Sequence, residues 1–83
     1  MLNMTLDLLP LGQSARISAV NWSCLVEEEA QRLQALGLDV GAKVAVAHRG
    51  VFAGADPLAI TVGRMTVALR RAHARAMQVE ELA

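Results

Sequence analysis

Cysteine, aromatic side chains and net charge are all scarce in this 83-residue chain, and each scarcity excludes a class of protein. Cys24 is the only cysteine, so no disulfide forms within the chain, and a reducing, cytoplasmic location is expected. Eight basic and eight acidic side chains cancel. This balance argues against a protein that relies on nucleic-acid phosphates for affinity, because such proteins carry clustered excess Lys and Arg.

Long apolar runs are also missing. No window approaches the roughly 18 continuous apolar residues of a membrane helix, so no membrane insertion is expected. Residues 1–11 contain no Lys or Arg and are interrupted by Asn3, Asp7 and Pro10, unlike an export signal. The short length predicts one domain, over residues 5–82, with a modest core and little room for a deep cleft.

Residues 56–70 predict a tight β-hairpin whose register follows from its turn. Glycine at the first position of a two-residue Gly63-Arg64 loop suits a type II′ turn, since it accepts a positive φ. The turn then fixes the pairs on both faces: Val62 with Met65, Ile60 with Val67 and Leu58 with Leu69 on the apolar face, and Thr61 with Thr66 and Ala59 with Ala68 on the other.

Two-residue alternation predicts three further strands. In residues 15–20 it places Ala15, Ile17 and Ala19 on one face, and in residues 43–49 it places Val44 and Val46 inward. Residues 77–80 alternate again and are expected to close the sheet beside the first strand. Before these strands, Thr5 is expected to begin one helical turn whose leucines cover an end of the core, and residues 70–76 predict another tight turn.

Over residues 25–36 the apolar residues change from two-residue alternation to the spacing of a helix, and this predicts the one substantial helix. Ser23 is expected to cap this helix, and Glu28 to pair with Arg32 one turn later. Gly37 is expected to end it.

Past Gly37, Leu38 is expected to fold back on Leu33 in a Schellman motif. The expected fold is therefore mainly β, with about five short strands in a small curled sheet or barrel and one helix between the first and second strands.

The order and spacing of these elements resemble the FeoA family over residues 5–80. The resemblance rests on RLxxLGLxxG at residues 32–41, GxDPL at residues 54–58, Leu69-Arg70, and MxV at residues 77–79. Val40 stands where the family usually has proline, and Ala55 separates a glycine from the Asp-Pro pair. The resemblance implies an SH3-like β-barrel, a cytoplasmic location, no catalysis and no cofactor, and a regulatory contact with the ferrous-iron permease FeoB.

Metal binding and catalysis find little support in the residues themselves. The available ligands are Cys24, His48, Asp56 and His73, and no pair has a CxxC or helical i,i+4 ligand spacing. No nucleophile has a recognisable base or oxyanion pocket, and no glycine-rich phosphate loop is present. We therefore expect neither a metal site nor an enzyme.

Two segments are candidates for partner binding. Val51 and Phe52 lie in a glycine-bounded loop, where they either bind a partner or, in the case of Phe52, cover the core. Arg70 and Arg71, with His73 and Arg75 nearby, form a cationic cluster that either contacts an acidic partner or is a solvated turn. Trp22 is expected to pack against the helix.

These observations predict a protein-protein contact with a FeoB-type permease through five residues: Arg49, Val51, Phe52, Arg70 and Arg71. The alternative is an SH3-like peptide- or ligand-binding module of the kind found in metal-dependent transcriptional repressors. An RNA-binding barrel is a third reading, disfavoured because the strands carry no aromatic stacking platform. Weak self-association through edge strands stays open.

Overall fold

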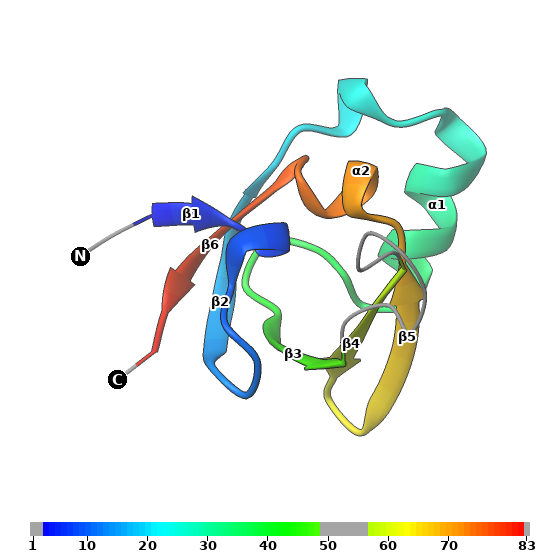
Figure 1. The fold of residues 1–83 in the computed structure, drawn as a ribbon. Coiled ribbons are helices and arrows are strands. Elements are labelled where there is room, and N and C mark those ends of the chain that lie inside the picture. The colour runs from blue at the N-terminus through cyan, green and yellow to red at the C-terminus, as the bar shows by residue number, and fades with distance from the viewer. Residues whose placement is uncertain (1–2, 49–56, 83) are drawn as a thin grey trace.

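The computed structural model describes residues 3–48 and 57–82, which form one six-stranded antiparallel sheet with short helices. The strand order is β1-β6-β2-β3-β4-β5. Figure 1 shows the sheet curling on itself, with both α-helices at one end of the molecule. The strands are β1 (Asn3–Thr5), β2 (Ser14–Val20), β3 (Lys43–His48), β4 (Leu58–Val62), β5 (Met65–Leu69) and β6 (Met77–Glu81). The helices are the 3-10 turns η1 (Leu6–Leu8) and η2 (Trp22–Cys24) and the α-helices α1 (Glu27–Ala35) and α2 (Arg71–Ala74).

The predicted fold class is confirmed at the level of a mainly β chain with one longer helix between the first two predicted strands. The strand count differs, because the three-residue β1 was not predicted and adds a sixth strand by pairing with β6. Its three residues are too few for their alternation to distinguish a strand from the helical turn predicted to begin at Thr5. In the described part of the chain, β1 and β5 are the two edges of the sheet, so closure into a barrel stays a prediction.

The β4-β5 hairpin has the predicted register at all five pairs. Gly63 has φ +59°, the left-handed conformation that the two-residue turn requires. Leu58, Ile60 and Val62 point into the core, as the alternation predicts. The turn therefore decides which hairpin residues are buried and which are left for the surface.

The core lies inside the curl of the sheet and is almost entirely aliphatic. Strand side chains meet Leu6 and Leu9 from the η1 segment and Leu33 from α1, all fully buried. The prediction that leucines near the N-terminus cover one end of the core is confirmed for Leu6 and Leu9, whereas Leu8 and Leu11 are exposed. The other fully buried large side chains are Ile17, Leu38, Val44, Val46, Leu58, Ile60, Leu69, Met77 and Val79.

The inward position predicted for Ala19 of β2 is wrong. Ala15 and Ile17 are buried, but Ala19 is exposed. The register between β2 and β6 shifts between Ile17 and Ala19, as in a β-bulge, and such a shift interrupts the two-residue alternation. The β6 strand itself pairs beside β2 as predicted.

The start of α1 also differs from the prediction, whereas its end does not. Val26 rather than Ser23 precedes the helix, and the Ser23 hydroxyl donates a hydrogen bond to Asn21 Oδ1 in the η2 turn. At the other end, Gly37 has φ +95° and the Leu38 amide donates to the Leu33 carbonyl at 2.9 Å. The Gly37 amide also donates to the Gln34 carbonyl at 3.0 Å, which completes the predicted Schellman motif.

No helix in residues 3–48 and 57–82 is long and apolar enough to cross a membrane. The longest, α1, has nine residues.

Candidate partner-binding surface

The cationic cluster predicted after the hairpin lies on and around α2, a helix of only four residues. An isolated helix of this length is unstable in water, so its conformation depends on contacts with the rest of the protein. Ala74 is fully buried beneath it, and the Ala76 carbonyl accepts a hydrogen bond of 2.8 Å from the Asn21 amide. We call the outer side of this segment, formed by Arg70, Arg71, His73 and Arg75, the α2 surface.

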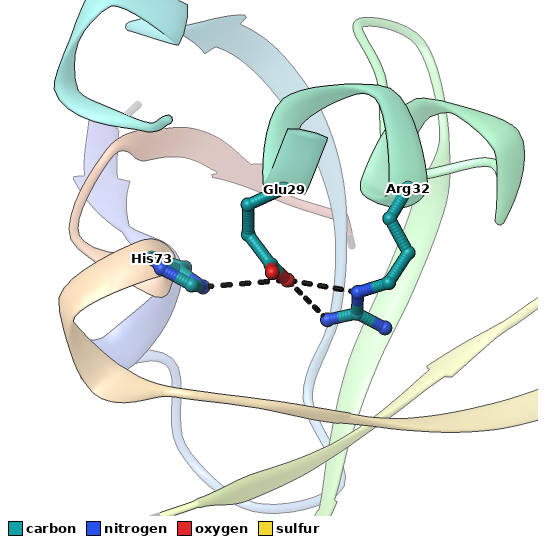
Figure 2. A network of polar contacts seen from close by, with 3 residues as sticks. All are labelled: Glu29, Arg32 and His73. Carbon is teal, nitrogen blue, oxygen red and sulfur yellow. Dashed lines mark hydrogen bonds and ion pairs between the residues drawn. The ribbon is translucent and has the colours of Figure 1, made fainter. Parts of the chain in front are cut away.

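A cluster of three polar side chains lies between α1 and α2 (Figure 2). Arg32 Nε donates to Glu29 Oε1 at 2.8 Å, and a terminal nitrogen of the same guanidinium donates to the same oxygen. His73 reaches this carboxylate from α2, with Nδ1 3.9 Å from Glu29 Oε1. Glu29, rather than the predicted Glu28, is therefore the partner of Arg32.

The pKa of Glu29 is lowered from its ordinary value of 4.5. The main cause is the hydrogen bond from Arg32; desolvation is the next largest effect and opposes it, and the neighbouring Arg32, His73 and Arg70 side chains contribute smaller effects that lower the pKa. Glu29 therefore lies among basic side chains from both α1 and the α2 segment.

A second carboxylate lies at the other end of α2. Asp7 is only 5% exposed, and its Oδ1 accepts a hydrogen bond from the Thr5 hydroxyl. Its Oδ2 lies 3.5 Å from Arg75 Nε, whose side chain is 63% exposed. The η1 segment and α1 therefore each bring one carboxylate to the α2 segment, in addition to the burial of Ala74.

The predicted partner-binding residues fall into three groups. Arg70 is exposed at the N-cap of α2, where it is accessible to a partner. Arg71 is half-buried and interacts with the protein itself. Arg49, Val51 and Phe52 lie outside the described residues, so their assignment stays a prediction.

Sequence reasoning missed the two carboxylates that position α2. Asp7 is flanked by leucines and gives no sign of pairing with a residue 68 positions later. Glu29 belongs to a run of three glutamates, and only the tertiary position of His73 distinguishes it from its neighbours.

The candidate metal ligands lie on different elements. Cys24 is exposed in η2, His48 is exposed at the end of β3, and His73 faces Glu29, whereas Asp56 is outside the described residues. Within the described ranges, no three His, Cys, Asp or Glu side chains come together as a metal-binding group. Trp22 is half-buried and packs against the core.

Comparison with known proteins settles the family. The FeoA domain family matches residues 4–81. The chain belongs to the FeoA family. FeoA proteins are non-catalytic accessory proteins associated with ferrous iron transport, and the fold and function class implied by the sequence resemblance are confirmed to that extent.

Two solved FeoA structures are similar over most of this FeoA chain. FeoA from Stenotrophomonas maltophilia, a zinc complex described as an SH3 domain protein, is 35% identical with a TM-score of 0.77. The match covers 93% of this chain and 89% of that one. FeoA from Chlorobium tepidum is 32% identical with a TM-score of 0.80, over 96% of this chain and 71% of that one.

The same fold occurs in a manganese-dependent transcriptional repressor, at 19% identity and a TM-score of 0.79. That match covers 96% of this chain but 42% of the repressor, and it shows a shared fold alone. A comparison with curated proteins found no match.

Proposed function

We propose that this FeoA protein regulates ferrous iron uptake by binding the cytosolic domain of a FeoB-type permease. The α2 surface, together with the predicted loop residues Arg49, Val51 and Phe52, forms the contact. The observation that carries this proposal is the exposed Arg70 at the N-cap of α2, a helix seated on buried Ala74 and flanked by Glu29 on one side and Asp7 on the other.

Fixation of α2 matters because a contact is stronger when its residues need no ordering on binding. Immobilising a flexible side chain or segment costs about 0.5–1.5 kcal/mol per residue at an interface. The backbone of α2 is ordered before the partner arrives, because Ala74 is buried and the Ala76 carbonyl is bonded to the Asn21 amide. Arg70 can then meet an acidic partner surface from a defined position.

The affinity expected from such a surface is modest. A chain of 83 residues offers a patch of several hundred Å² at one end, near the lower limit for stable complexes. Modest affinity suits a regulator that associates with the permease and dissociates from it. It also means that loss of one well-placed cation is measurable.

Binding to the purified permease domain tests the proposal through a matched pair of variants. Arg70→Gln removes one positive charge from the α2 surface, and we expect about fivefold weaker binding. Gln31→Glu changes the net charge by the same amount on α1, but two residues from Glu29 and hence on nearly the opposite side of that helix. Its affinity is expected to match the wild type. Equal effects of the two variants would contradict the assignment.

Phe52→Asp tests the loop half of the surface by the same binding measurement. We expect loss of binding with circular dichroism and melting unchanged, and an intact complex would remove Phe52 from the contact. The likeness to the repressor shows a shared fold and indicates no partner. Specific retention of DNA in a filter assay would favour the repressor-module alternative over the permease contact. Self-association through the sheet edges is checked by the same samples in sedimentation.

A further inference from the structure

A hollow of about 200 Å³ lies on the outer face of the sheet beside the β4-β5 turn. This turn is at the end of the molecule away from α2, as Figure 1 shows. The hollow is therefore separate from the α2 surface. Its lining residues are Ser14, Lys43, Val44, Ala45, Thr61 and Gly63.

The hollow exists because a small side chain stands between two larger ones. Ala45 on β3 is directly opposite Ser14 on β2 and directly opposite Thr61 on β4, so the three form one row across the outer face. The methyl group of Ala45 leaves space that its neighbours do not fill. The Thr61 hydroxyl lies over this space and donates to the Ala45 carbonyl at 3.4 Å.

The hollow carries a positive charge that the fold does not balance. Lys43 lies two residues before Ala45 on the same face of β3, and it is directly opposite Arg16. Like charges at directly opposite positions destabilise a sheet. Arg16 has Glu80 on its other side, but no carboxylate in the described ranges forms an ion pair with Lys43.

The surroundings of Lys43 fit a carboxylate better than a phosphate. The lining offers one ammonium group and the Ser14 hydroxyl, since the Thr61 hydroxyl already donates to the Ala45 carbonyl, and the β3 backbone is paired with β2 on one side and β4 on the other. Phosphate sites typically use guanidinium forks or free backbone amides, as at helix N-termini. A single negative charge and two acceptor oxygens match this donor set.

We propose that the hollow is a second docking site, which takes the carboxylate of an acidic side chain on the protein partner. Lys43 pairs with the carboxylate, Ser14 and Thr61 border it, and Ala45 provides the space. The site adds a contact at the end of the molecule opposite the α2 surface. Lys43 is then a cation that the sheet tolerates at some cost in stability because binding uses it.

The chemistry of the site can be tested without the permease, because Lys43 is the only lysine in the sequence. Protein labelled with ¹³C-lysine gives a single lysine ε-methylene signal to follow by NMR. N-acetylglutamate α-amide, titrated at constant ionic strength, is expected to shift this signal to saturation. Inorganic phosphate, titrated in a parallel experiment, is expected to shift it less at equal concentration.

Two alanine-to-leucine variants distinguish binding in the hollow from a general effect of surface charge. Ala45→Leu fills the space and keeps Lys43, so the saturable shift is expected to disappear. Ala19→Leu makes the same change at an exposed position of β2 and is expected to leave it intact. A shift that persists in Ala45→Leu, no saturable shift in the wild type, or stronger binding of phosphate would each overturn the proposal.

The identity of the partner rests on the proposed function and is tested with the permease domain. Lys43→Met is expected to weaken binding about threefold to tenfold and to reduce its salt dependence. Its melting temperature is expected to equal or exceed that of the wild type, because a like-charge pair with Arg16 is removed. Unchanged affinity would overturn the permease as the partner at this site. If the wild type itself fails to bind, the proposed function fails, and the NMR titration alone decides the site.

Discussion

Replacing Leu33 with alanine is the most direct test of how the core holds the α2 surface in place. Leu33 is fully buried and is the one buried residue assigned to α1. The substitution removes three carbon atoms, which at about 0.8 kcal/mol for each buried methylene gives about 2.5 kcal/mol. The cavity left behind adds to this, since buried Leu to Ala changes cost about 2–5 kcal/mol in total.

We expect Leu33→Ala to lower the free energy of unfolding by about 3 kcal/mol. For a domain of this length, one kcal/mol shifts the melting temperature by about 4–8 °C, so the expected fall is about 12–24 °C. Total stabilities of about 0.05–0.15 kcal/mol per residue imply that the variant still folds at low temperature, but with a reduced margin. Urea unfolding followed by circular dichroism measures the change.

Leu8→Ala is the matched control, because it makes the same chemical change at a side chain that is 62% exposed in η1. Its expected cost is within about 0.5 kcal/mol. Hydrogen exchange adds a local readout: amides of α1 in Leu33→Ala are expected to lose protection before those of the β4-β5 hairpin. Equal costs for the two variants, or uniform loss of protection, would refute the view that one leucine anchors α1 and its contact with α2.

Two further predictions concern the Glu29 network and the hairpin turn. Because the pKa of Glu29 is lowered below 4.5 in the folded protein, its ionised form contributes stability above pH 4.5, and this contribution disappears as the pH falls through the lowered pKa. The difference in stability between wild type and Glu29→Gln is therefore expected to shrink below pH 4.5 in urea unfolding series, and a difference independent of pH would contradict this. Gly63→Ala is expected to cost about 1–2 kcal/mol, because φ is +59° and an added Cβ meets nothing within 4 Å, so the cost is backbone strain alone. Gly63→Asn is expected to cost less, since asparagine tolerates this conformation, and equal melting temperatures for the two variants would contradict the explanation.

Features fixed by a few neighbouring residues were predictable from the sequence. The whole hairpin register follows from the two-residue turn at Gly63, and the end of α1 follows from Gly37 with its leucines on either side. In both cases glycine permits the backbone conformation of the turn, and the spacing of the neighbouring apolar residues determines which side chains face the core. The inward positions of Val44 and Val46 follow in the same way from alternation.

Features that depend on contacts between residues far apart in the sequence were not predictable. The register shift in β2 arises against β6, about 60 residues later in the chain, and it exposes Ala19 although the local pattern places it inside. The three-residue strand β1 is too short to be identified from its own sequence and is defined by its pairing with β6. Ser23 lies in the η2 turn instead of capping α1, because its hydroxyl donates a hydrogen bond to the side chain of Asn21, two residues earlier.

The candidate site combines both kinds of feature, which explains why its charges were predictable but not their arrangement. The sequence shows Arg70 and Arg71 side by side and gives no reason to rank them. In the folded chain they differ, because α2 packs with Ala74 fully buried and lies beside Glu29 of α1 and Asp7 of η1, with Arg70 exposed and Arg71 half-buried. A four-residue helix has no stable orientation of its own. Which of the two arginines is accessible to a partner therefore depends on tertiary contacts, two of them with carboxylates more than 40 residues earlier in the chain, and a surface of this kind can be located only once the fold is known.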